Sequence, residues 1–182
     1  MARSDGEQNK ARILEVASAA LSASSDATLQ SIAKLAGVGQ GTLYRHFPTR
    51  EALLVAVYRQ DVEELINAAP LLVAAHPPLE ALRRWLDQLA AYGRIKHGAA
   101  EAVHAATRAD LSSEYYNKVT AVITLLLDAG KGAGVVRPDI DADELLLLVG
   151  FLWRLDNTDW EARAHHLLDL VMDALRPEVR PG

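Results

Sequence analysis

The sequence contains no cysteine among its 182 residues. A disulfide framework, a zinc site built on thiolates and a thiol nucleophile are therefore excluded. Long apolar stretches are also lacking, because the longest run, residues 145–153, is too short to span a bilayer. The first residues carry charges rather than the apolar segment of a signal peptide. We therefore expect a soluble cytoplasmic protein.

Strand-forming patterns are scarce as well, since no segment sustains the alternation of apolar and polar residues that a half-buried strand requires. Alanine and leucine dominate where valine, isoleucine and threonine would be needed. Apolar residues recur instead at helical spacing, in a chain that is 50% hydrophobic and 24% charged. The sequence therefore predicts an all-α fold of about nine helices. Their approximate ranges are 7–23, 28–36, 40–46, 49–69, 77–98, 99–107, 110–129, 141–154 and 159–176.

Charge is distributed unevenly along the chain, which carries a formal net charge of −5. Residues 1–50 contain six Lys and Arg against four Asp and Glu, whereas residues 51–182 contain 13 against 20. A weakly acidic chain can still bind nucleic acid when its basic residues are gathered in one region. Any such binding is therefore expected in the first fifty residues.

Residues 28–47 indicate a helix, a tight turn and a second helix, which is the helix-turn-helix arrangement. Gly37 at the turn can adopt a positive φ, and small alanines in the first helix let the second one approach. Leu43 and Phe47 lie four residues apart, so both face inward. A second helix that protrudes in this way fits a DNA major groove. Its outward residues are polar or small: Gln40, Gly41, Thr42, Tyr44, Arg45 and His46.

Residues 8–58 resemble the DNA-binding domain of the tetracycline-repressor (TetR) family, most specifically in the string Gly-Thr-Leu-Tyr-x-His-Phe at residues 41–47. The segments Ile32-Ala33, Ala36-Gly37-Val38 and Arg50-Glu51-Ala52-Leu53 add to the likeness. In that family the first three helices bind DNA, and the remaining helices bind a ligand and dimerise. The resemblance therefore implies a helix-turn-helix domain over residues 1–48 and a helical regulatory domain over residues 49–182.

The same resemblance implies roles for individual residues of the first domain. Gln40 and Thr42 stand where base edges are read, with Gly41 between them and Gln30 as a partner. Residues that stand where phosphates are held are Thr28, Tyr44, His46 and Arg50. Gly39 replaces the Ser or Thr cap that the family often has, at a cost of only a few tenths of a kcal/mol.

The regulatory domain is similar to that of many such repressors, and the segment Gly134-Val135-Val136-Arg137-Pro138-Asp139 suggests the SbtR-like subgroup. A pocket between its helices is expected to bind an effector, although each candidate residue is also an ordinary core residue. The pocket candidates are Trp85, Leu89, Tyr92, His104, Tyr116, Ile123 and Phe151. In the family the last two helices form the dimer interface. The interface candidates are Leu147, Gly150, Trp153, Leu167, Leu170 and Val171.

Other sites find little support in the sequence. His97 and His104 are seven residues apart, but no carboxylate or cysteine completes a metal-binding pattern, so neither a metal nor a cofactor is expected. The series Asp139-x-Asp141-x-Asp143 lacks the glycine of a calcium loop and indicates a helix cap. No nucleophile-base grouping stands out, so an enzyme is not expected.

These observations predict a homodimeric transcriptional regulator, most simply a repressor that a small molecule releases from a palindromic operator in double-stranded DNA. Two recognition helices related by a two-fold axis would enter successive major grooves about 34 Å apart. One alternative is an activator or a DNA binder without an effector. Another is a helical small-molecule-binding module that does not bind DNA.

Overall fold

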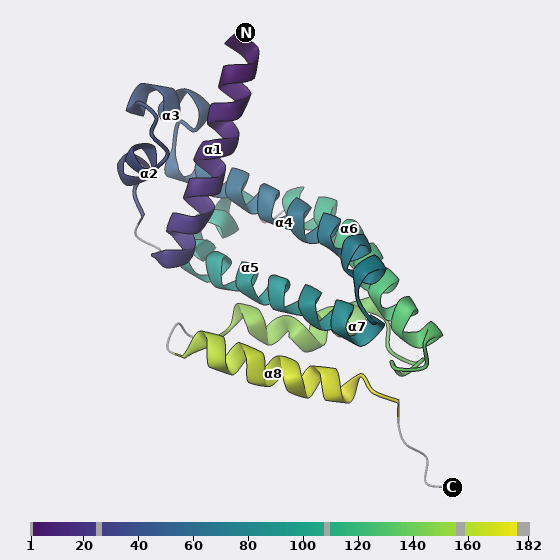
Figure 1. Cartoon of the computed structure of the whole chain (residues 1–182). Helices are drawn as coiled ribbons and strands as arrows, with labels where there is room; N and C mark the ends of the chain where they lie inside the picture. The colour runs from purple at the N-terminus through teal and green to yellow at the C-terminus, as the bar shows by residue number, and fades with distance from the viewer. Residues whose placement is uncertain (1, 25–26, 108–109, 156–158, 178–182) are drawn as a thin grey trace, which may run out of the picture. The chain divides into compact units, whose positions relative to one another are not determined.

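The computed structural model describes residues 2–24, 27–107, 110–155 and 159–177. Within these ranges the chain is helical and contains no strand, so the predicted all-α fold is confirmed (Figure 1). Eight α-helices and one 3-10 helix are present in the described part, close to the nine helices predicted. They are α1 (Ala2–Ala23), α2 (Leu29–Leu35), α3 (Gln40–His46), α4 (Arg50–Ala75), α5 (Pro78–Thr107), α6 (Asp110–Gly132), α7 (Ala142–Leu148), the 3-10 helix η1 (Val149–Trp153) and α8 (Trp160–Ala174).

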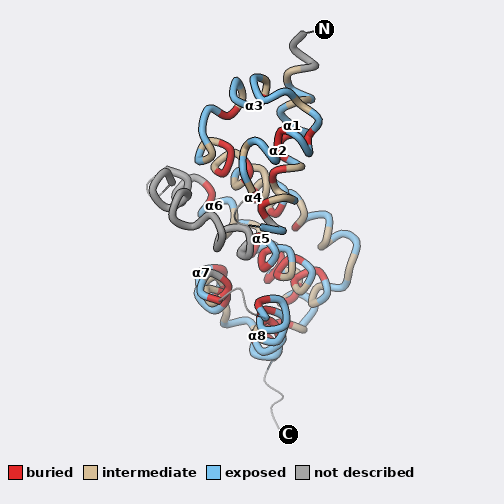
Figure 2. Tube along the Cα trace, turned by 90° about the vertical axis from the view of Figure 1, so that its left-hand side faces the viewer, coloured by how far each residue is buried: buried red, intermediate tan, exposed pale blue. Residues whose placement is uncertain are grey.

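The chain divides into two compact units. The first unit comprises residues 1–62 and 95–109, and the second comprises residues 63–94 and 110–182. The helices α4 and α5 each contribute to both units, because the division falls within them. Each unit has its own apolar core, and Figure 2 shows the amphipathic helix α8 with buried residues on one side and exposed residues on the other.

The core of the first unit is built from the inward faces of α1, α2, α3 and the start of α4. Helical spacing places Ile13, Ala17 and Leu21 on one side of α1, and all three are buried. They form one cluster with Ile32 of α2 and Leu43 of α3. The first three helices contact one another pairwise, so α2 and α3 are fixed against α1.

Trp85 of α5 belongs to the core of the second unit and is fully buried. Its indole Nε1 donates a hydrogen bond to the carbonyl oxygen of Leu65 in α4 at 2.9 Å, so the buried polar atom is satisfied. Leu82, one turn before Trp85 on the same helix, and Leu86, the residue directly after Trp85, are also buried. Ile123 of α6 contributes to this apolar interior without any exposed surface.

The loop between α6 and α7 closes one end of the second unit. Gly134 adopts φ +69°, and the backbone N–H of Arg137 donates to the Leu175 carbonyl at 2.8 Å. A capping box then starts α7, in which Asp141 accepts from the Glu144 N–H at 2.8 Å and Glu144 accepts from the Asp141 N–H at 2.9 Å. The expected helix cap at this acidic segment is confirmed.

Several predicted helix boundaries differ from the structure. A break was predicted near Gly98, but α5 continues to Thr107, because an isolated glycine costs a helix only about 1 kcal/mol and alanines follow it. The helix predicted over 141–154 changes to 3-10 geometry at Val149, where β-branched and glycine residues adjoin. The helix α4 continues through Pro70 to Ala75. None of the described helices combines the length and apolarity needed to cross a membrane.

Candidate nucleic-acid interface

A capping box fixes the start of α2. Thr28 has extended backbone angles, and its hydroxyl accepts a hydrogen bond from the Ser31 N–H at 3.2 Å. The Ser31 hydroxyl accepts in turn from the Thr28 N–H at 3.0 Å and donates to the Thr28 carbonyl at 2.8 Å. Thr28 therefore caps α2, and its hydroxyl is already engaged in ordering that helix.

The turn between α2 and α3 has the geometry that its glycine predicts. Gly37 adopts φ +66°, and its N–H donates to the Lys34 carbonyl at 3.2 Å. The next N–H, that of Val38, donates to the Ala33 carbonyl at 3.0 Å, and the valine side chain packs against the core of the first unit. Gly39 then precedes α3 without a side-chain cap.

Helix α3 buries one side and exposes the other. Leu43 has no exposed surface and Phe47 only 3%, so these two side chains hold the helix against the core. Tyr44 is 49% exposed, and Gln40 and Gly41 are exposed as well. The other outward residues are Arg45, which is exposed, and Thr42 and His46, which are half-buried.

Arg50 lies at the start of α4 and reaches back towards α2. Its Nε donates to the Ala27 carbonyl at 3.4 Å, which links α4 to the residue that precedes the cap of α2. Thr49 caps α4 by accepting from the Ala52 N–H at 3.1 Å. A backbone N–H at Glu51 and the Thr49 hydroxyl bind the Glu51 carboxylate and hold its pKa below the usual value.

A groove runs between α2, the turn and the start of α3. Its volume is about 520 Å³. It brings together three of the residues predicted to contact DNA, namely Thr28, Gln30 and Gln40, whereas Tyr44, His46 and Arg50 do not line it. Its lining residues are Thr28, Gln30, Ser31, Ala33, Lys34, Val38 and Gln40. The sequence analysis did not predict Ser31 and Lys34 at this site. Lys34 lies four residues after Gln30 and three residues after Ser31, and this helical spacing could have indicated a shared face of α2.

The residues predicted to form an effector pocket occupy different environments in the second unit. Trp85, Leu89, Tyr92 and Ile123 are buried, whereas Phe151 is half-buried. Tyr116 is 49% exposed, and its hydroxyl donates to Asp143 Oδ1 at 2.8 Å. That bond raises the pKa of the tyrosine. The structure thus places Tyr116 at the surface, and the side chain of His104 lies outside the described residues.

The residues predicted to form a dimer interface include two conspicuously exposed leucines. Leu147 of α7 is 81% exposed and Leu170 of α8 is 53% exposed. Gly150 and Leu167 are half-buried, Val171 is buried, and the Trp153 side chain lies outside the described residues. Leu147 also lines a cavity of about 530 Å³ that the sequence did not predict. The other residues around this cavity are Arg137, Asp139, Ile140, Glu144, Leu148, Ala174 and Leu175.

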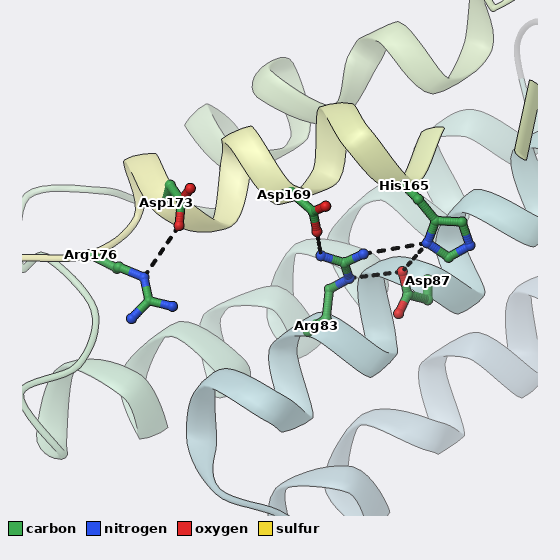
Figure 3. A network of polar contacts seen from close by, with 6 residues as sticks. All are labelled: Arg83, Asp87, His165, Asp169, Asp173 and Arg176. Atoms are coloured by element: carbon green, nitrogen blue, oxygen red, sulfur yellow. Dashed lines mark hydrogen bonds and ion pairs between the residues drawn. The ribbon is translucent and has the colours of Figure 1, made fainter. Parts of the chain in front are cut away.

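A network of charged side chains links α5 to α8, as Figure 3 shows. Arg83 donates to Asp87 Oδ1 at 2.9 Å and pairs with Asp169 across the helices. His165 Nδ1 lies 3.6 Å from Asp87 Oδ1 and 3.4 Å from Arg83 Nη2. The bond from Arg83 lowers the pKa of Asp169. Among the described residues, no cluster of three His, Asp or Glu side chains is arranged to hold a metal ion.

Comparisons with known proteins agree with this arrangement. The family described as bacterial regulatory proteins of the tetR family matches residues 13–57, and the SbtR-like C-terminal domain of transcriptional regulators matches residues 77–177. The chain is 27% identical over 168 residues to an HTH-type transcriptional repressor of Mycobacterium tuberculosis, covering 82% of each chain.

Solved structures are similar over almost the whole length. A TetR transcriptional regulator from Streptomyces coelicolor is 40% identical, with a TM-score of 0.81, and the match covers 93% of this chain and 99% of that one. A TetR regulatory protein from Mycobacterium vanbaalenii is 31% identical, with a TM-score of 0.75, and the match covers 97% and 100%. The chain therefore belongs to the TetR family of helix-turn-helix transcriptional regulators and carries an SbtR-like C-terminal domain.

Proposed function

We propose that this regulator is a homodimeric repressor that binds a palindromic operator through α3 and leaves it when a small molecule binds the second unit. The observation that carries this proposal is the two-sided character of α3. Leu43 and Phe47 hold the helix against the core, while Gln40, Gly41 and Tyr44 remain exposed to a partner. A polar helix held rigidly at the surface is what major-groove recognition requires.

Sequence reading falls to Gln40 and Thr42, and Gln30 lines the same groove as Gln40. A glutamine amide can form paired hydrogen bonds with adenine in the major groove. Tyr44, His46 and Arg50 would contact the DNA backbone and set the register of the helix. Thr28 would act mainly by ordering α2, because its hydroxyl already belongs to the capping box.

Dimerisation would involve the exposed leucines of α7 and α8. An apolar side chain that is 81% exposed, as Leu147 is, favours a surface that a second copy covers. Leu170 of α8 and the half-buried Leu167 extend this surface on the other helix. A two-fold axis would then present two copies of α3 to successive major grooves about 34 Å apart.

Effector release needs a ligand with different affinities for the DNA-bound and free conformations. A coupling of about 1–3 kcal/mol per site is usual for such switches. The helix α4 contributes residues to both units, which gives a rearrangement in the regulatory unit a continuous route to the DNA-binding unit. We place the protein in the cytoplasm, where the operator is, and assign it no catalytic role.

The repressor relative in Mycobacterium tuberculosis supports the sign of regulation that we propose. A gel-shift titration against the DNA flanking the protein's own gene tests the operator, and a thermal-shift screen of metabolites and drugs tests the effector. We expect nanomolar binding to one flanking fragment and its loss with a ligand that also raises the melting temperature. An operator complex that persists with every stabilising ligand would contradict the release mechanism.

A further inference from the structure

Lys34 lies in the groove that already contains Gln30 and Gln40. It belongs to the last turn of α2, its side chain is exposed, and it is the one charged residue among those that line the groove. Four residues separate it from Gln30, so the two side chains lie on the same face of α2. The groove therefore carries a positive charge next to the residues proposed to read bases.

Only some of the polar side chains in the groove remain available to bond a ligand. The hydroxyls of Thr28 and Ser31 bond to each other and to the backbone within the capping box. The donors left to face a ligand are the ammonium of Lys34 and the amides of Gln30 and Gln40. Because no carboxylate lines this groove, its chemistry fits an anion.

A second cation lies close to the turn. The guanidinium Nη2 of Arg12 is 3.5 Å from the position that a Cβ on Gly37 would occupy. Among the described residues, neither Arg12 nor Lys34 has an ion-pair partner within the chain. Two exposed cations beside one turn, neither of them held in an ion pair within the described part of the chain, contribute positive potential at this surface.

We propose that Lys34 binds a phosphate of the operator backbone in this groove, next to the base pair that Gln40 reads; this inference rests on the proposed function. Thr28 and Lys34 are six residues apart, which corresponds to about 9 Å along α2 at 1.5 Å per residue. Arg50 is linked to Ala27 beside the Thr28 end, so α2 has a cation at each end. The phosphate that Lys34 holds is therefore different from the one beside Arg50.

The test compares the salt dependence of DNA binding for Lys34→Gln with that of the unaltered protein. The probes are an operator selected from a randomised duplex pool and an unrelated 30-bp duplex. Each phosphate neutralised contributes about 0.9 to the slope of log K against log[salt], so a dimer should lose about 1.8 from its slope. When the salt concentration rises from 50 to 200 mM, the DNA affinity of the unaltered protein should then fall by a factor roughly tenfold larger than the factor for Lys34→Gln.

Matched variants separate this contact from a general loss of charge. Arg59→Gln removes an exposed cation of the same unit, about 13 Å along α4 from Arg50, and should leave the slope unchanged. Lys34→Arg keeps the charge and should retain the slope. All variants should keep the helical circular-dichroism spectrum, because both side chains are exposed.

A scan of single methylphosphonate substitutions locates the contact on the selected operator. Neutralising one particular phosphate in each half-site should weaken operator binding by the unaltered protein but not by Lys34→Gln. Specific operator binding with an unchanged slope for Lys34→Gln would overturn the Lys34 inference and leave the proposed function standing. Absence of any specific operator for the unaltered protein would overturn both.

Discussion

In the first unit, some of the polar side chains around the turn stabilise helix α2, and others remain available to contact DNA. Thr28 was predicted to hold a phosphate, yet its hydroxyl closes the capping box of α2. Lys34 was absent from the predicted interface, although it lies in the same groove as Gln30 and Gln40. The motif predicts which residues surround the turn, whereas the hydrogen bonds between them, which only coordinates show, decide which donors remain for DNA.

Gln40→Ala should weaken discrimination at one base pair of each half-site by about 1–3 kcal/mol, because an amide that pairs with a base edge is lost. Overall binding to unrelated DNA should change little, since phosphate contacts remain. Selection from a randomised operator pool measures the preference at every position. Gln88→Ala, at an exposed position of α5, is the control. An identical selected sequence for Gln40→Ala and the unaltered protein would reject Gln40 as a base reader.

Asp139 titrates well below an ordinary aspartate. Arg137 donates two hydrogen bonds of 2.7 Å to its carboxylate, and with the Asp139 backbone N–H this lowers the pKa from 3.8 to about 2. Because the pKa of Asp139 is lower in the folded state than in the unfolded state, the ionised carboxylate stabilises the folded state at pH values above the unfolded-state pKa. This contribution to the free energy of unfolding is lost as the pH falls from about 4 to 2.

Arg137→Gln should move the Asp139 midpoint towards 3.8 and flatten the pH dependence of stability in that window. Carbon-13 NMR titration of the carboxyl group measures the midpoint directly. Arg163→Gln, at an exposed position of α8, should leave the titration as it is. A midpoint that stays near 2 in Arg137→Gln would show that the backbone, rather than the guanidinium, controls this carboxylate.

Helix boundaries were predictable from the sequence where the spacing of apolar residues and the capping residues agree. They were less predictable where a single glycine is flanked by residues that favour a helix. Thr28 and Asp141 mark the starts of α2 and α7 as the sequence predicts. Gly98 does not interrupt α5, because propensity terms of about 1 kcal/mol are small beside the neighbouring helix-forming residues. The close approach of Val136 to the last turn of α6 leaves no signal in the sequence, because it depends on how the following loop folds back.

Gly130→Ala should destabilise the second unit by about 1–3 kcal/mol through overpacking. A Cβ at this buried position would overlap Val136 Cγ2 and lie 3.0 Å from its Cβ. Valine is β-branched and stiff, so it moves aside only at a cost. Urea unfolding followed by circular dichroism measures the change.

Gly132→Ala provides the matched control for this prediction. It lies in the same helix end, but a Cβ there meets no atom within 4 Å. It should leave stability unchanged or raise it by up to about 1 kcal/mol, because alanine favours the helix over glycine. The double variant Gly130→Ala with Val136→Ala should cost less than the two single costs added together. Equal stability of the two alanine variants would mean that Val136 leaves more room than the structure indicates.

At the scale of the whole molecule, the family and its all-α fold followed from one short string and from helical spacing. The burial of the residues predicted for a pocket and an interface did not follow in the same way, because buried and exposed leucines look alike in a sequence. Ile123 and Leu147 both occupy apolar positions of helices, yet one has no exposed surface and the other is 81% exposed. Burial depends on how distant helices pack, and in the proposed dimer the burial of Leu147 would depend further on a second copy of the chain.

Leu147→Asp should convert the dimer to a monomer, because a carboxylate would lose its hydration in the closed interface. Leu71→Asp is the control, since Leu71 is 70% exposed on α4 and lies outside the proposed interface. Analytical ultracentrifugation should show a monomer for the first variant and a dimer for the second. Operator binding supplies an independent measurement, because a monomer neutralises half as many phosphates and its salt slope should fall by about half. If Leu147→Asp remains a dimer with unaltered operator affinity, the interface lies elsewhere. A carboxylate at position 147 would measurably weaken dimerisation if the partner subunit covered that position.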